Sequence, residues 1–121
     1  MLTKQKIFNK VTNHLLTQKR QCKKNGECQY RGKDGLACAI GCLIPNKYYQ
    51  REWDEYATSI HDILSEYSPK NVFGQFLSQD VTSDFLGGLQ EIHDWHHPNS
   101  WRKLLTEFAA DNYLKMPKVL L

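Results

Sequence analysis

Long apolar runs are missing from this sequence of 121 residues. No segment approaches the roughly 18–20 consecutive apolar residues that a membrane-spanning helix needs, so we expect no membrane partner. Residues 1–6 lead into no apolar stretch of the kind found in secretory signals, and such a signal is not expected. Repeats, low-complexity tracts and linkers are also missing, and the length fits a single domain over residues 1–121.

The chain has four cysteines: Cys22, Cys28, Cys38 and Cys42. In a chain without an export signal, the default is reduced thiols in a cytosol rather than a disulfide framework. Free cysteine is also a good small core residue. We therefore predict mostly reduced, partly buried thiols. Aromatic residues are not scarce, and their 12% share excludes a disordered chain.

The net charge of +3 is divided unevenly along the chain. Residues 1–51 hold eleven Lys/Arg and two Asp/Glu, a net of +9, whereas residues 52–121 hold five and eleven, a net of −6. This split makes a dipolar surface if the two halves face apart. A basic face could then meet nucleic acid or an acidic protein. The alternative is that the halves pair with each other or are simply solvated.

Apolar residues recur mostly at the spacing of amphipathic helices. Four segments are predicted as helices: 3–19, 56–67, 82–96 and 100–114. The turn signals Asn25-Gly26 and Gly32-Lys33-Asp34-Gly35 leave room for a short β-hairpin between the first two helices. The predicted fold is therefore mainly α, a small bundle of about four to five helices.

Three smaller segments are less regular. The apolar run 37–44 reads as a buried strand or a buried helix, and its small residues favour a short helix that ends before Pro45. Residues 70–80 are expected to be irregular. The pair Gly87-Gly88 lies inside the third predicted helix, where each glycine costs about 1 kcal/mol relative to alanine. That cost indicates tight packing, or a helix that starts later.

The segment 28–45 reads CQYRGKDGLACAIGCLIP. It resembles the centre of a group of small proteins of tailed phages and bacterial prophages that share C-x-Y-R-G-x-x-G-L-x-C-A-I-G-x-L-I. The likeness extends to the opening helix at 4–8, to Leu-Gln-x-Ile-His-Asp at 89–94 and to Trp101. The resemblance implies a phage context in the cytoplasm of a bacterial host, with a role in host takeover or counter-defence. It implies no particular activity.

Zinc is the one cofactor that the residue types suggest. The four cysteines are spaced C-x5-C-x9-C-x3-C, unlike the close pairs of structural zinc sites, and a mixed site of Cys28, Cys38 and a histidine is an alternative. His93 and His97 would share a helix face as two ligands, with Asp94 or Glu91 completing the set. The competing explanation is a histidine-rich helix end favoured by the helix dipole. We expect no bound metal.

Thiol catalysis would use Cys38 or Cys28 as nucleophile, His93 as base and Asp94 to orient it. Two features weaken this hypothesis. Apolar neighbours around Cys38 are typical of an inert core cysteine, and Asp94, directly after His93, would point elsewhere on a helix. We therefore expect no catalysis.

Nucleic-acid contact would use Arg31 and Lys33 on phosphates and Tyr30 stacked on a base. No known nucleic-acid reader motif is present, however. The alternative for Arg31 is a structural role, paired with an acidic residue of the C-terminal half such as Asp94.

Protein binding is the function that the sequence favours, with a host or defence protein as partner. Three aromatic residues, Tyr48, Tyr49 and Trp53, could anchor such an interface together with arginine. The same three residues could equally belong to the core.

Overall fold

The structure is a computed structural model, and it describes residues 1–119. Its helices are α1 (Lys4–Gln18), α2 (Glu52–Glu55), α3 (Ile60–Glu66), α4 (Pro69–Phe73), α5 (Ser83–Trp95) and α6 (Trp101–Asp111). Two short antiparallel strands, β1 (Lys23–Lys24) and β2 (Glu27–Cys28), form a hairpin. The predicted mainly α class with a short hairpin is confirmed. None of the helices in this part of the chain has the length and apolar character needed to cross a bilayer.

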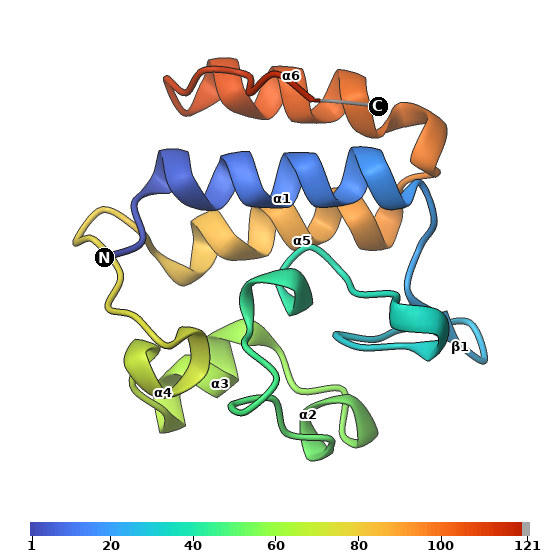
Figure 1. Cartoon of the computed structure of the whole chain (residues 1–121), viewed down its shortest axis with the longest axis vertical. Coiled ribbons are helices and arrows are strands. Elements are labelled where there is room, and N and C mark those ends of the chain that lie inside the picture. The colour runs from blue at the N-terminus through green and yellow to red at the C-terminus, as the bar shows by residue number, and fades with distance from the viewer. Residues whose placement is uncertain (120–121) are drawn as a thin grey trace.

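Three long helices form one layer of the molecule, and the short elements form the other. In Figure 1, α6 lies along α1 and α5, while the hairpin and α2 to α4 gather on the opposite side. The contacts agree, because α6 packs on α1 and α5, and α3 packs on α5. Phe108 of α6 stacks on Phe8 of α1 at 6.0 Å between ring centroids and meets Phe85 of α5 at 5.4 Å. Aromatic packing therefore joins all three long helices.

Two of the three long helices start at a threonine that caps them, whereas Ser100 before α6 makes no side-chain cap hydrogen bond. Thr3 accepts a hydrogen bond from the backbone N–H of Lys6 at the start of α1, and Thr82 accepts one from Phe85 at the start of α5. Each hydroxyl satisfies a backbone donor that has no partner inside the helix. A threonine hydroxyl in the sequence therefore marks the start of each of these two helices.

Several boundaries differ from the prediction, and the last helix, α6, ends at Asp111 rather than at residue 114. The second helix, α3, begins at Ile60 rather than Tyr56, because Ser59 caps it and Ala57 has a φ of 48°, which breaks the chain direction. Of residues 70–80, expected to be irregular, the first four belong to the short helix α4, which starts at Pro69 and ends at Phe73, with Gly74 as its C-cap. A proline in the first turn and a left-handed glycine after the last are common at helix ends.

The segment 28–45 is scaffold with little regular structure. Arg31 and Ala37 form one isolated antiparallel bridge, and only Gly41–Leu43 of the predicted short helix is helical, as a single 3-10 turn. A Cβ atom on Gly41 would lie 1.9 Å from the backbone oxygen of Tyr30. The two stretches of chain therefore approach so closely that position 41 requires glycine.

The two helical glycines have different surroundings, and this predicts opposite effects of alanine. A Cβ on Gly88 would lie 3.0 Å from Cε2 of Phe108, whereas a Cβ on Gly87 would meet no atom within 4 Å. We expect Gly87→Ala to raise the free energy of unfolding by about 1 kcal/mol through helix propensity. Gly88→Ala gains the same propensity but displaces the Phe108 ring, so it should be the less stable variant. Urea denaturation followed by circular dichroism measures both, and equal stabilities would contradict this packing.

Candidate functional site

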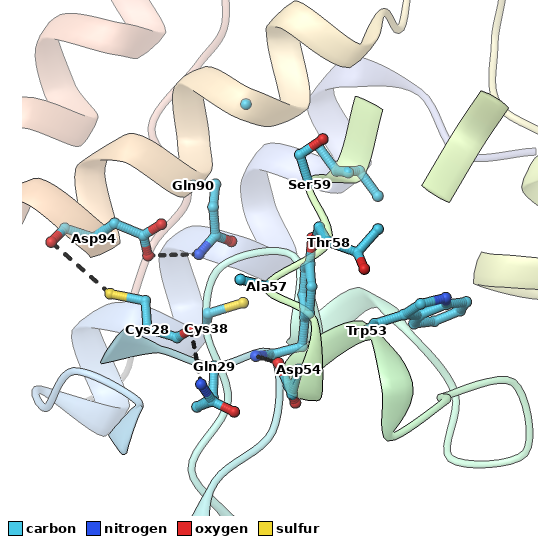
Figure 2. Close-up of a pocket in the computed structure, with 13 residues that line it drawn as sticks. Cys28, Gln29, Cys38, Trp53, Asp54, Ala57, Thr58, Ser59, Gln90 and Asp94 are labelled. Carbon is cyan, nitrogen blue, oxygen red and sulfur yellow. Dashed lines mark hydrogen bonds between the residues drawn. The ribbon is translucent and has the colours of Figure 1, made fainter. Parts of the chain in front are cut away.

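A cleft of about 320 Å³ opens between the two layers. One wall is the face of α5 that carries Gly87, Gln90 and Asp94. The other walls are the chain leaving β2, at 28–30, and the connection between α2 and α3, at 57–59. Figure 2 shows these side chains converging from segments far apart in the sequence. The fold therefore builds a shared pocket from the basic first half and the acidic second half of the chain.

His93 lies behind this cleft and is fully buried. Its Nε2 accepts a hydrogen bond from the backbone N–H of Cys22 at 2.9 Å, and its Nδ1 lies 2.7 Å from Oδ1 of Asp94. A backbone N–H can only donate, so Nε2 carries a lone pair and Nδ1 carries the proton that Asp94 accepts. The ring also stacks on Trp101 at 5.5 Å. Both ring nitrogens are therefore engaged within the protein.

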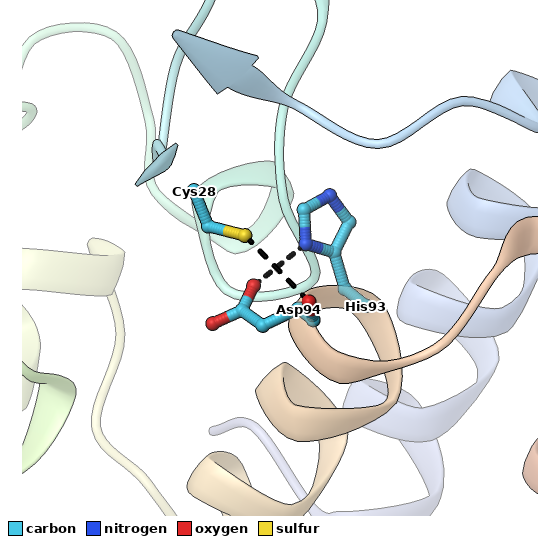
Figure 3. Close-up of side chains that lie close together, drawn as sticks. All are labelled: Cys28, His93 and Asp94. Atoms are coloured by element: carbon cyan, nitrogen blue, oxygen red, sulfur yellow. Dashed lines mark hydrogen bonds and ion pairs between the residues drawn. The ribbon is translucent and has the colours of Figure 1, made fainter. Parts of the chain in front are cut away.

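The side chain of Asp94 folds back toward His93, contrary to the expectation that neighbours on a helix diverge (Figure 3). It does so in the last turn of α5, which ends at Trp95 because His96 is extended. Oδ1 of Asp94 also accepts from the side-chain amide of Gln90 at 2.6 Å. The divergence of neighbouring side chains holds inside a helix. In the last turn of α5 the Asp94 side chain can instead turn toward the ring of His93.

Cys28, His93 and Asp94 bring candidate ligand atoms within 4.8 Å of one another. The predicted partner His97 is elsewhere: it follows the end of α5, is exposed, and accepts from the backbone N–H of Asn99. The prediction that His93 and His97 share a helix face is therefore wrong. Cys38 lines the cleft but does not belong to the three-residue cluster.

The hydrogen bonds of His93 work against metal binding by this cluster. A metal on Nδ1 would require the proton to move to Nε2, where it would point at the donor N–H of Cys22. A metal on Nε2 would displace that same N–H and leave it buried without a partner. The donor set has the right residue types, but its histidine is held in the wrong tautomer.

We expect zinc to bind the protein no more tightly than it binds a variant that lacks the cluster thiol. The experiment is calorimetric titration of zinc at neutral pH into the reduced wild type and into Cys28→Ser. Equal, weak heats are expected, because the fixed tautomer of His93 excludes a three-ligand site. Stoichiometric binding by the wild type that Cys28→Ser abolishes would contradict this view.

All four cysteines are free thiols, as predicted. Burial raises the pKa of Cys22 to about 11 and that of Cys42 to about 12. Burial and then the charge of Asp94 raise the pKa of Cys28 to about 12. The pKa of Cys38 is also raised well above its ordinary value, again mainly by burial. A nucleophilic cysteine needs the opposite shift, so these thiols are protonated and inert at neutral pH.

The raised pKa values predict a slow reaction with iodoacetamide. Only the thiolate reacts, so the rate at Cys28 should rise about tenfold per pH unit from pH 7 to 10 without levelling off. Glutathione, with an ordinary thiol pKa, should level off at about pH 9.5. Peptide mapping by mass spectrometry after quenching reports each cysteine separately. Fast labelling of Cys28 or Cys38 of the folded protein at pH 7 would contradict the assignment, and protein unfolded in urea gives the reference rate.

Tyr30 and Arg31, candidates for nucleic-acid contact, are used inside the protein. Tyr30 is buried, and its hydroxyl donates to the backbone oxygen of Thr58 at 2.7 Å. The Arg31 guanidinium donates from Nε to the oxygen of Gly41, from Nη1 to Asn46 and from Nη2 to the oxygen of Ile44. The role of Arg31 is therefore internal, but its partners are carbonyl and amide oxygens rather than Asp94.

The carboxylate that binds Tyr30 and Arg31 is that of Asp54, in α2. It accepts from the backbone N–H groups of Tyr30, at 2.7 Å, and Arg31, at 3.2 Å, and from the hydroxyl of Tyr49. Of the three nucleic-acid candidates, Lys33 alone is exposed. Asp54 was not singled out from the sequence, because nothing in its local spacing signals backbone donors more than twenty residues away.

The aromatic candidates for protein binding lie mostly inside. Trp53 is 4% exposed and packs edge-on against Tyr49 and Tyr67, and Tyr48 and Tyr49 are half-buried. The largely exposed aromatic rings nearest the cleft in sequence are instead Tyr56 (76%) and Trp95 (78%). The helical period offered a signal for Trp95, since it falls off the apolar stripe of α5.

A second, wider hollow of about 630 Å³ lies beside the hairpin. Its basic residues include Lys24, Lys33 and Arg51, and its acidic residues include Glu27 and Glu55. Arg51 and Glu55 form an ion pair with 3.1 Å between Nε and Oε1. The basic half of the chain is therefore partly neutralised at this surface, which weakens it as a phosphate-binding face.

Comparison of the chain with protein-family models, with curated proteins and with solved structures finds no match. The geometry of the cleft and the residues around it are therefore the features from which a function can be inferred.

Proposed function

We propose that this chain is a small phage-type accessory protein that binds a protein partner without catalysis. The partner is a host or bacterial defence protein in the cytoplasm, and binding inhibits it. The phage context follows from the resemblance of segment 28–45 to small phage and prophage proteins. The binding role depends on one observation, an open cleft whose wall residues Ala57 and Asp94 have exposed aromatic residues, Tyr56 and Trp95, as their neighbours in sequence.

Tyr56 and Trp95 are each next in sequence to a residue of the cleft wall, Ala57 and Asp94 respectively. Both rings are more than three-quarters exposed, so neither contributes much to the core. Large exposed aromatic side chains beside a concavity are typical anchors of protein interfaces, because they bury much area at little entropic cost. With Trp53 turned inward, Tyr56 and Trp95 are the exposed aromatic residues next in sequence to the cleft wall, whereas Phe76 (59% exposed) and Tyr113 (96%) lie elsewhere in the chain.

The residues that could support a metal or thiol enzyme, or nucleic-acid binding, already form hydrogen bonds within the protein or are protonated. His93 has both nitrogens hydrogen-bonded and the thiols are protonated, which disfavours a metal or thiol enzyme. Tyr30 and Arg31 are bonded internally, which leaves nucleic-acid binding to exposed lysines. Protein binding is the function that needs none of these groups.

Capture from a bacterial lysate, with the purified chain as bait, tests the proposal when anchor variants are run in parallel. Tyr56→Ala and Trp95→Ala remove exposed rings, so the fold should be unaffected. Tyr113→Ala is the matched control, because Tyr113 is 96% exposed and follows α6, with no residue of the cleft wall next to it in sequence. We expect a protein captured by the wild type and the control to be lost with Trp95→Ala. Loss of an interface anchor costs about 2 kcal/mol or more, roughly a 30-fold weaker Kd, measurable by calorimetry with the purified partner.

Equal capture by the wild type and by the double variant of Tyr56 and Trp95 would contradict the proposal. Nucleic acid that binds with a steep dependence on salt, and without change in Trp95→Ala, would instead favour the basic first half as the functional surface.

A further inference from the structure

We propose that the cleft receives a basic side chain, lysine or arginine, of the protein partner. This inference rests on the proposed function and specifies the chemistry of the contact. The side chain would enter between α5 and the connection from α2 to α3, with its charged end at Asp94 and its alkyl stem along the apolar wall.

The charge of the cleft is the first support. Among its lining residues in the described chain are two aspartates, Asp54 and Asp94, and no lysine, arginine or histidine. The chain as a whole carries a net charge of +3, so this concavity has the opposite sign to the molecule. A cleft lined by one sign of charge attracts ligands of the other sign.

The two carboxylates differ in whether they have an oxygen that accepts no hydrogen bond from the described chain. Asp54 uses both oxygens on internal donors. Asp94 uses Oδ1 twice, for Gln90 and His93, and no donor within residues 1–119 reaches its Oδ2. Figure 2 shows Asp94 on the α5 wall with Gln90 beside it. The two bonds to Oδ1 hold the carboxylate in place, with its second oxygen free for an incoming ammonium or guanidinium group.

The apolar part of the wall suits the stem of such a side chain. Trp53 and Ile60 contribute carbon surface to the cleft, together with Ala57. Lysine and arginine bury their methylene groups along apolar surface while the charged end reaches polar partners. An anion would face two carboxylates here, and a purely apolar side chain would leave Asp94 without a counter-charge.

Gly87 supplies an independent observation. It lies in the interior of α5, where glycine is unfavourable, yet a Cβ at this position would touch nothing. Packing explains Gly88 through the ring of Phe108, but packing does not explain Gly87. Gly87 lines the cleft, so the missing side chain keeps open the space that an inserted residue would occupy.

The test uses peptides as probes and the full chain as receptor. The amide resonances of the labelled protein are followed by NMR during titration with Ac-Gly-Lys-Gly-NH2, its arginine analogue and its norleucine analogue, which lacks the charge. We expect the two basic peptides to shift the amides of Gly87, Gln90 and Asp94, and norleucine to shift them weakly or not at all. Equal shifts from norleucine would overturn the proposal.

Two variants test separately the charge of Asp94 and the open space beside Gly87. Asp94→Asn keeps an oxygen that can accept from His93 and Gln90 but removes the charge, so affinity for the lysine peptide should fall at least fivefold. Asp111→Asn, on the exposed end of α6, is the matched control and should bind like the wild type. Gly87→Leu fills the cleft from a position with free room and should also abolish binding. Unchanged affinity in Gly87→Leu, or in a folded Asp94→Asn, would overturn the proposal.

Failure of this inference is distinguishable from failure of the proposed function. If Trp95→Ala loses the captured partner while Gly87→Leu and Asp94→Asn keep it, the protein interface stands and the basic side chain does not enter the cleft. If Gly87→Leu and Asp94→Asn also lose that partner, the cleft is part of the interface and the inference is supported.

Discussion

The hydrogen bond from the backbone N–H of Cys22 to Nε2 of His93 is the interaction on which the arrangement of the cleft depends. It joins the connection between α1 and the hairpin to α5, across 71 positions of sequence. Gln21 adds a second attachment, because its side-chain amide donates to the backbone oxygen of His93 at 2.8 Å. Cys28 then meets the last turn of α5 through the oxygen of Asp94. The hairpin, which has only two residues per strand, is thus positioned by the end of a long helix.

The same interaction decides the chemistry of the neighbouring groups. With Nε2 occupied, the proton of His93 must lie on Nδ1, and this orients Asp94. Cys28 lies next to that carboxylate, whose charge adds to burial in raising its pKa. Cys28, His93 and Asp94 have the residue types of a catalytic site, but their hydrogen bonds connect the hairpin region to the end of α5. Within residues 1–119, this arrangement leaves the second oxygen of Asp94 without a donor, at the wall of the cleft.

Much of the helical frame could be predicted from the sequence, because its causes are local. The apolar period of α1 and the hydroxyl caps at Thr3 and Thr82 depend on residues within a turn or two. The site could not be predicted in the same way. The partners of Arg31 are backbone oxygens exposed by the 3-10 turn at Gly41–Leu43, which no spacing rule reveals. Tyr56 was expected to start the second helix on its apolar face, yet it is exposed while Trp53 is buried, because α2 ends at Glu55 and leaves Tyr56 outside both helices.

The cleft brings together residues from 28 to 94, and this has a consequence for biosynthesis. During translation, α1 and the hairpin leave the ribosome long before α5 does, so β1 and β2 have nothing to dock on for most of that time. A pair of two-residue strands is not stable by itself in water. The cleft, which we propose as the partner-binding face, therefore forms only after α5 has emerged, and a nascent chain that stops short of α5 carries no assembled cleft.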